Sequence, residues 1–171
     1  MTRPLFLLFF VVFLAGTGVG KSEEGEFTFP EKVTTVEGDV VDLMKLAEKQ
    51  TVVVIIMKAA WCPVCREQLL RIKKNLSDFK KCNITFLVIC PGSLEAVAGV
   101  KKQTQFPYPF VNDTDFSFAD HLKLRMSQTE MIPAVIVLET DLSIKWMEKG
   151  RGPGNFSDEI IFEKLDCSNW I

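Results

Sequence analysis

Two cysteines separated by two residues are the side chains in this sequence best suited to chemistry. Cys62 and Cys65 enclose Pro63 and Val64, directly after the β-branched run TVVVIIM at 51–57 and at the start of a helical pattern. Free backbone N–H groups at a helix N-terminus favour an anion, so we expect them to stabilise a Cys62 thiolate. Sulfurs at this spacing lie near enough to bridge. The pattern predicts Cys62 as the attacking thiol and a more enclosed Cys65 as the resolving thiol.

A zinc site and a structural disulfide use the same cysteine spacing. A zinc ribbon repeats the pair, whereas the other cysteines of this chain are isolated and its only histidine is His121. We therefore expect no metal, and we favour a redox pair over a structural bridge. His121 lies among leucines in an expected helix, which favours a surface or packing role over catalysis.

Buried strands and amphipathic helices alternate around the pair. The expected strands are 51–57, 84–90, 134–138 and 143–148, and the expected helices are 63–79, 93–102, 116–124 and 156–165. Residues 27–49 predict an N-terminal hairpin, with a turn at 37–39, that runs into a short helix. This order predicts an α/β fold in which helices cover both faces of a mixed sheet.

Length and composition are those of one ordinary globular domain. The chain has 171 residues, of which 47% are hydrophobic and 25% charged. Lys plus Arg is 20 against 22 for Asp plus Glu, a net charge of -2. This balance gives no electrostatic reason to expect a nucleic-acid partner. We expect one domain over residues 27–167.

The first twenty residues are typical of a secretory signal peptide. Arg3 precedes the apolar run LFLLFFVVFLA at 5–15, and the small residues Gly16, Gly18 and Gly20 follow. The run is short against the roughly 20 residues that cross a bilayer, which disfavours an uncleaved anchor. We expect cleavage of residues 1–20, no membrane attachment afterwards, and a mature chain that is secreted or held in the lumen of the secretory pathway. The C-terminal sequence SNWI is not a retention signal, which favours secretion.

Four acceptor sequons for N-glycosylation indicate the same compartment. Their asparagines are Asn75, Asn83, Asn112 and Asn155. Asn83 adjoins an expected strand, where a glycan fits poorly, so we expect occupancy at some sites only. The secretory pathway also tolerates disulfides.

The residues around the cysteine pair resemble the thioredoxin-like superfamily. The likeness is carried by WCPVCR at 61–66 after a β-branched strand, and by Ile132-Pro133-Ala134 at the start of a later strand. The long N-terminal portion, FPYPF at 106–110 and VNDTD at 111–115 are similar to the redoxin branch, which includes peroxiredoxins and alkyl hydroperoxide reductase relatives.

This resemblance implies a thioredoxin-like three-layer sandwich with an N-terminal hairpin extension, and thiol chemistry without an organic cofactor. It implies that Pro133 is a cis proline facing the cysteines and that Ile132 offers backbone groups to a substrate chain. A trans proline opening a strand is the alternative. Trp61 and Pro63 would contact the substrate beside the sulfurs, with core packing as the alternative for Trp61.

The sequence departs from these families at several places. Peroxiredoxins have Thr or Ser three residues before the attacking cysteine and a later arginine, whereas this chain has Ala59 and Pro133. The buried acid of thioredoxins is replaced by Ile56, so Lys58, Glu67 or a water would have to move the proton. The Pro-Val pair between the cysteines lacks the histidine of strongly oxidising relatives, which disfavours a strong oxidase.

The resemblance also bears on the remaining cysteines. Cys90 would end a strand next to the one before the pair, as a small buried residue or, alternatively, as an auxiliary redox thiol. Cys82 and Cys167 could bridge and fasten the last helix, although spacing does not determine connectivity. Because the chain has five cysteines, at least one stays unpaired.

Three functions are compatible with these residues. The leading hypothesis is a secretory-pathway thiol–disulfide oxidoreductase, in which Cys62 attacks a protein disulfide, Cys65 resolves the mixed disulfide, and a thiol electron donor regenerates the pair. The reverse direction oxidises protein thiols, and the reduction potential decides between the two. The alternatives are an atypical peroxiredoxin-like thiol peroxidase that uses Cys62, and a redox-silent protein-binding module.

Overall fold

The structure is a computed structural model that describes residues 27–150, 152 and 163. The expected signal peptide at 1–20, the sequon at Asn155, the expected helix at 156–165 except Glu163, and Cys167 lie outside the described residues.

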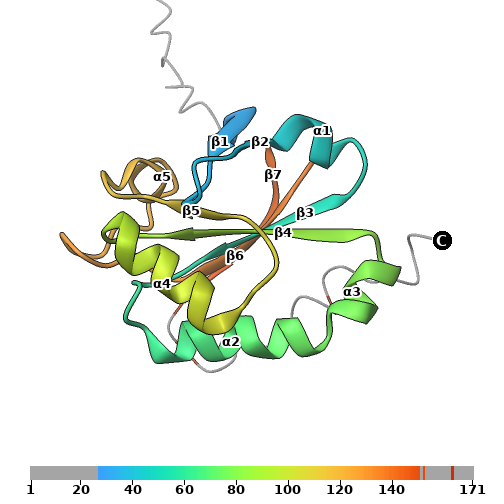
Figure 1. Cartoon of the computed structure of the whole chain (residues 1–171). Coiled ribbons are helices and arrows are strands. Elements are labelled where there is room, and N and C mark those ends of the chain that lie inside the picture. The colour runs from blue at the N-terminus through green and yellow to red at the C-terminus, as the bar shows by residue number, and fades with distance from the viewer. Residues whose placement is uncertain (1–26, 151, 153–162, 164–171) are drawn as a thin grey trace, which may run out of the picture.

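A mixed sheet of five strands forms the centre of the molecule, in the order β5-β4-β3-β6-β7 (Figure 1). Its strands are β3 (Thr51–Ile56), β4 (Ile84–Cys90), β5 (Phe110–Asn112), β6 (Ala134–Leu138) and β7 (Ile144–Lys149). β3 pairs in parallel with β4 and antiparallel with β6. Every residue of β4 and β6 is buried, as expected for apolar strands covered on both faces.

Helices cover both faces of this sheet, as predicted (Figure 1). One face carries α2 (Pro63–Lys74), α3 (Leu76–Lys81) and α4 (Leu94–Thr104). The other face carries α1 (Leu43–Ala47), α5 (Ser117–His121) and the hairpin of β1 (Lys32–Thr34) and β2 (Val40–Asp42). The predicted three-layer α/β fold with an N-terminal hairpin is confirmed.

Two cores result from the alternation of side chains along β3. Val53 and Ile55 belong to the core under α2, α3 and α4, which also holds Cys62, Cys65 and Cys90. Val52 and Val54 belong to the core under α1, α5 and the hairpin. The cysteine pair therefore lies on the α2 side of the sheet.

The structure differs from the predicted elements in three places. The single helix expected at 63–79 is broken at Asn75, whose φ of -102° and ψ of 14° leave the helical region. Helix α5 is shorter than expected, because Phe116 and Lys123 adopt left-handed backbone conformations at its two ends. Strand β5 was not predicted, since it has three residues and directly follows two prolines.

None of the described helices is long and apolar enough to cross a membrane.

Candidate functional site

The cysteine pair lies where the chain leaves β3 and starts α2. A disulfide joins Cys62 and Cys65, whose Cα atoms are 5.4 Å apart. Cys62 is the N-cap of α2, with extended backbone angles, and Pro63 is the first helical residue, where a missing N–H costs no hydrogen bond. Because β3 and β4 are parallel, the pair lies at the same edge of the sheet as Cys90, the last residue of β4.

Backbone N–H groups are directed at both sulfurs. The Cys65 N–H donates to Cys62 Sγ at 3.3 Å, and the Lys58 N–H donates to Cys65 Sγ at 3.4 Å. These donors and the helix dipole create a positive potential at the pair, which favours a thiolate once the disulfide is reduced. Cys62 is 5% exposed and Cys65 is 1% exposed. Cys62 is therefore the more exposed of the two residues, in the direction expected for an attacking thiol.

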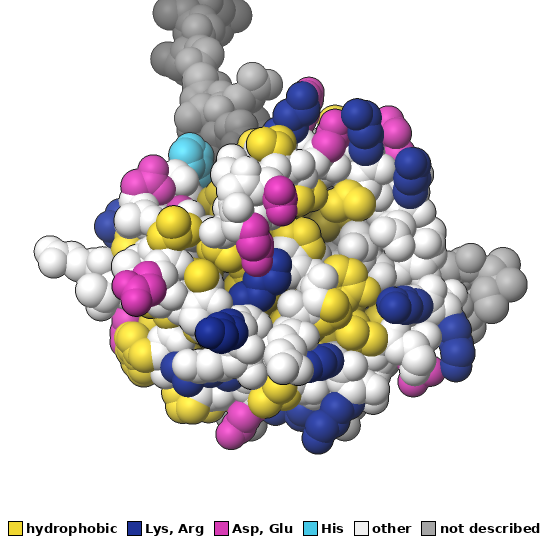
Figure 2. Space-filling model, viewed as in Figure 1, with side chains coloured by type: hydrophobic (Ala, Val, Ile, Leu, Met, Phe, Trp, Pro, Cys, Tyr) yellow, Lys and Arg dark blue, Asp and Glu magenta, His cyan; other side chains and the backbone are white. Residues whose placement is uncertain are grey.

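An exposed apolar surface surrounds the pair. Trp61 is 56% exposed and Val64 45% exposed, and Pro63 between the cysteines is also exposed. Core packing, the alternative for Trp61, therefore does not apply. The Lys58 Nζ lies 4.6 Å from the centroid of the Trp61 ring and 3.1 Å from Glu130 Oε1, so this cation holds the indole beside the site. Figure 2 shows hydrophobic surface at the end of the molecule where α2 begins.

The segment at Ile132 and Pro133 does not have the geometry that the resemblance implied. No peptide bond among the described residues is cis, so the prediction of a cis Pro133 is wrong. The Ile132 N–H donates to the Leu124 carbonyl at 2.6 Å, and the Met131 N–H donates to the Lys58 carbonyl at 2.9 Å. The Ile132 N–H is thus not available to a substrate chain, because the protein's own backbone already bonds to it.

Cys90 is a free thiol that is fully buried at the end of β4. Its S–H donates to the Pro91 carbonyl at 3.5 Å. Burial raises the pKa of Cys90 to about 12, against a smaller opposing effect of the Arg66 charge. A thiol that stays protonated at neutral pH is a poor nucleophile, so the structure favours the packing role over the auxiliary redox role.

The other predicted residues lie away from the pair. Cys82 is disulfide-bonded, and Cys167, the partner considered for it, lies outside the described residues. His121 is exposed; its Nδ1 lies 2.7 Å from the Ser117 carbonyl and its ring lies against Phe27.

In the described part of the chain, no cluster of three or more His, Cys, Asp or Glu side chains is arranged to hold a metal ion.

The sequons of the described residues differ in how their amides are used. Asn75 lies at the junction of α2 and α3 without a side-chain cap bond. Asn83 donates through Nδ2 to the Lys49 carbonyl. Asn112, in β5, donates through Nδ2 to the Gly92 carbonyl at 2.7 Å, and its Oδ1 accepts from the Thr114 hydroxyl.

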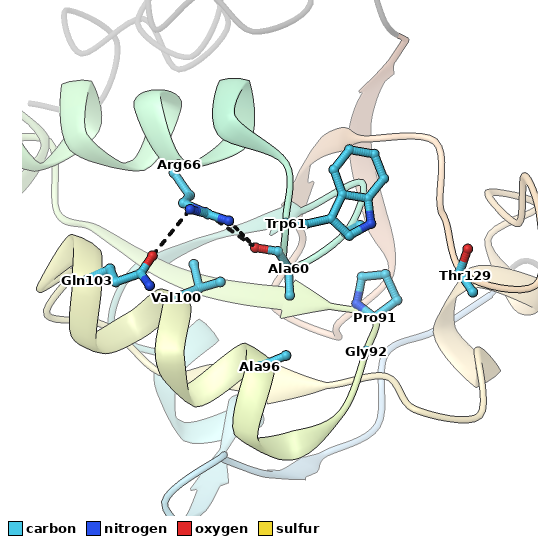
Figure 3. Close-up of a pocket in the computed structure, with 10 residues that line it drawn as sticks. Ala60, Trp61, Arg66, Pro91, Gly92, Ala96, Val100, Gln103 and Thr129 are labelled. Atoms are coloured by element: carbon cyan, nitrogen blue, oxygen red, sulfur yellow. Dashed lines mark hydrogen bonds between the residues drawn. The ribbon is translucent and has the colours of Figure 1, made fainter.

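A cavity of about 490 Å³ opens beside the redox pair. Figure 3 shows that its walls come from the loop before Cys62, from the loop after β4 and from α4. Arg66 extends into it from α2: Nε and Nη2 donate to the Ala60 carbonyl at 3.3 and 3.0 Å, and Nη1 donates to Gln103 Oε1 at 3.3 Å (Figure 3). Arg66 and Gln103 were not among the site residues predicted from the sequence. No local signal brings them together, since the contact joins two helices far apart in the chain.

Comparison with known proteins agrees with this fold. The sequence profile described as the AhpC/TSA family matches residues 25–147. No curated protein sequence matches the chain.

Solved structures with a similar fold include two peroxiredoxins. Peroxidoxin BcpB from Mycobacterium tuberculosis superposes with a TM-score of 0.70 at 16% identity, over 85% of this chain and 96% of that one. Peroxiredoxin Q from Xanthomonas campestris gives 0.69 at 15% identity, over 81% and 91%. A secreted Mycobacterium tuberculosis disulfide oxidoreductase homologous to Escherichia coli DsbE gives 0.61 at 15% identity, over 82% and 95%. At these identities the likeness shows a shared fold.

Proposed function

The chain belongs to the AhpC/TSA family, and from that premise we propose that it is a thiol–disulfide oxidoreductase that acts on protein substrates in the secretory pathway. One observation carries the proposal: Cys62 and Cys65 form a disulfide at the N-terminus of α2, and Cys62 is the more exposed of the two residues. Two sulfurs that bond to each other at a helix N-terminus can cycle between dithiol and disulfide.

The exchange proceeds in two displacements. In the reduced protein, the Cys62 thiolate attacks one sulfur of a substrate disulfide, and the other substrate sulfur leaves as a thiolate that takes up a proton. The Cys65 thiolate then attacks Cys62 Sγ, which forms the intramolecular disulfide and releases the second substrate sulfur. The substrate gains two electrons and two protons, and the cysteine pair is oxidised. The exposed surface of Trp61, Pro63 and Val64 is placed to contact the substrate during this exchange.

A thiol peroxidase that uses Cys62 is the second candidate, because AhpC/TSA is the family that matches and two similar folds are those of a peroxidoxin and a peroxiredoxin. The site residues weigh against it. Ala59 is 2% exposed and has no hydroxyl to bind peroxide, and Pro133 supplies no guanidinium. We therefore rank disulfide exchange first.

Insulin reduction and peroxide consumption, measured on the same preparation, separate these functions. We expect the wild-type chain to reduce insulin with dithiothreitol as the electron donor. Cys62→Ser should lower the rate of insulin reduction by at least about 100-fold. Cys65→Ser should accumulate a mixed disulfide with insulin that mass spectrometry detects. The matched control, Cys90→Ala, should keep the activity. Rapid peroxide turnover that Cys62→Ser abolishes would favour the peroxidase instead. A pair that does not cycle between its two redox states would favour a redox-silent binding module.

We also propose that the chain is secreted and glycosylated. The proposal is supported by the apolar segment after Arg3, the small residues that follow it, and the four sequons. Signal cleavage can be tested by N-terminal sequencing of the chain secreted from animal cells. A secreted product that still begins at Met1 would contradict cleavage.

A further inference from the structure

Arg66 presents a positive charge to the cavity beside the disulfide. The guanidinium is partly buried and bonds to two neutral acceptors, the Ala60 carbonyl and the Gln103 amide. An arginine has more N–H donors than these three contacts use. Across the described residues, no Asp or Glu oxygen lies within ion-pair distance of Arg66, whereas Lys58 and Lys101 each have such a partner. A partly buried cation without a carboxylate partner is a binding element for an anion.

The rest of the cavity is largely apolar. Ala59, Trp61, Pro91 and Val100 contribute walls, and the polar side chain of Gln103 lies at the Arg66 end. The volume, about 490 Å³, falls within the range of roughly 300–1,000 Å³ that is typical of small-molecule sites. The cavity therefore suits a small molecule that has an apolar part and one anionic group.

The cavity also adjoins both ends of the redox motif. Trp61 immediately precedes Cys62, and Arg66 immediately follows Cys65. The guanidinium bonds to the Ala60 carbonyl, and Ala60 is two residues before Cys62, so at most roughly 7 Å of chain separates their Cα atoms. Because the neighbours of the pair on both sides line the cavity, a ligand whose carboxylate binds Arg66 would lie next to the chain segment that carries Cys62.

We propose that this cavity binds a small thiol, or its disulfide, that carries a carboxylate, and that this molecule exchanges electrons with the Cys62–Cys65 pair. The proposal rests on the thiol–disulfide function proposed above and names the class of its electron carrier. The carboxylate bonds to the remaining N–H groups of Arg66, and the carbon chain lies against the apolar wall that includes Trp61 and Pro91.

The exchange balances with two molecules of the thiol. The thiolate of the first attacks Cys62 Sγ; a mixed disulfide forms, the bond between Cys62 and Cys65 breaks, and Cys65 leaves as a thiolate that takes up a proton. The thiolate of the second attacks the ligand sulfur of this mixed disulfide and releases the Cys62 thiolate. The two thiols lose two electrons and become one small disulfide, and the protein pair is reduced. The reverse sequence oxidises the pair with the small disulfide.

Three small disulfides that differ in charge test the proposal. The reduced full chain is oxidised by dithiodipropionate, which is anionic, by hydroxyethyl disulfide, which is neutral, and by cystamine, which is cationic. Each reaction is followed by alkylation of the remaining protein thiols and mass spectrometry. The rate constant for oxidation of the protein by each disulfide is then divided by the rate constant for oxidation of dithiothreitol by the same disulfide. We expect an anionic preference of about tenfold over the neutral compound, the usual effect of one charge-assisted hydrogen bond.

Two variants assign this preference to the cavity. Arg66→Gln removes the charge. Gln103→Glu places a carboxylate beside Nη1, which neutralises the guanidinium while the bonds to Ala60 remain; because Gln103 is exposed, this change does not threaten folding. Both variants should reduce the anionic preference to within about twofold of none. The matched control is Lys74→Gln, which removes a charge from an exposed position eight residues along the same helix and should keep the preference.

Each outcome of this experiment supports or overturns the proposal. A preference for the anionic disulfide that both cavity variants lose supports it. Equal relative rates for the three disulfides, or a preference that Arg66→Gln and Gln103→Glu retain, overturn it while the oxidoreductase function stands. A reduced pair that reacts with none of the three disulfides, the neutral one included, overturns both the proposed function and this inference.

Discussion

Cys62 and Cys90 belong to the same core, yet their surroundings suit them to different chemistry. Cys62 caps a helix in which the Cys65 N–H donates to its sulfur, and it retains some exposure. Cys90 ends a strand, is fully buried, and has only the Pro91 carbonyl as a polar neighbour within hydrogen-bond distance among the described residues. The backbone that surrounds each sulfur, rather than the residue type, decides which thiol can become an anion.

The buried Cys90 thiol should make folding stability depend on alkaline pH. An unfolded thiol loses its proton near pH 9.0, whereas burial raises the pKa of folded Cys90 to about 12. Below pH 9 the Cys90 thiol is protonated in both the folded and the unfolded protein, so it adds no pH dependence to stability. Above pH 9 the thiol loses its proton in the unfolded protein only, so the free energy of unfolding falls as the pH rises towards 12. Between pH 8 and pH 10, urea unfolding should show wild type losing more stability than Cys90→Ala, by on the order of 1 kcal/mol. Equal losses in the two proteins would contradict this assignment.

At the scale of the elements, the loop that follows β3 is tied to the segment that precedes β6. The Lys58 N–H donates to Cys65 Sγ, its carbonyl accepts from the Met131 N–H, and its Nζ pairs with Glu130 and lies over Trp61. One residue thus contacts the Cys65 sulfur, the exposed indole of Trp61 and the segment at 130–131. The side chains of Lys58 and Glu130 are 19% and 22% exposed, so this ion pair is largely screened from solvent.

Breaking this ion pair should disturb both stability and the Trp61 environment. Glu130→Gln leaves the Lys58 charge partly buried without its partner, and we expect it to cost about 1 kcal/mol in urea unfolding and to shift Trp61 fluorescence. The control is Asp78→Asn, which breaks the exposed pair between Lys81 and Asp78 and should cost less than about 0.5 kcal/mol. An unchanged Trp61 emission spectrum in Glu130→Gln would contradict the proposed role of Lys58.

At the scale of the whole molecule, the sheet separates the chemistry from much of the remaining surface. The parallel strands β3 and β4 end at one edge of the sheet (Figure 1). The disulfide and the cavity lie at that edge. Lys and Arg side chains are spread over the visible face together with acidic ones, and do not form a single basic patch (Figure 2). Of the sequons in the described residues, Asn75 and Asn83 lie at element boundaries, whereas Asn112 pairs with Cys90 at the same edge of the sheet as the cysteine pair.

The use of the sequon amides predicts which asparagine carries a glycan. An N-linked glycan replaces a hydrogen of the asparagine Nδ2. In Asn112, Nδ2 donates to the Gly92 carbonyl. Asn75 makes no side-chain cap bond, and Ser77 of its sequon is exposed. In chain secreted from animal cells, Asn75→Gln should remove one endoglycosidase-sensitive shift in gel mobility, and Asn112→Gln should remove none. A glycopeptide that contains a fully occupied Asn112 would contradict this expectation.

Local patterns in the sequence determined most of the layers and the position of the redox pair. The β-branched run at 51–57 is typical of a strand covered on both faces, and within a helix Pro63 is tolerated only in the first turn. These patterns depend on neighbours along the chain, which is why they could be predicted. The break at Asn75 and strand β5 were missed; strand β5 forms by pairing with β4, a contact that its own three residues do not encode.

Tertiary structure alone decided what surrounds the pair. The contact of Arg66 with Gln103 joins α2 to α4, the Lys58 ion pair joins two loops far apart in sequence, and the Ile132 N–H bonds to Leu124 instead of remaining free. A hydrogen bond or ion pair of this kind forms only after the sheet has brought its partners within about 3 Å, a distance that residue spacing does not encode. The sequence therefore specified the position of the cysteine pair, while the folded chain specified the cavity and the Arg66 charge beside it.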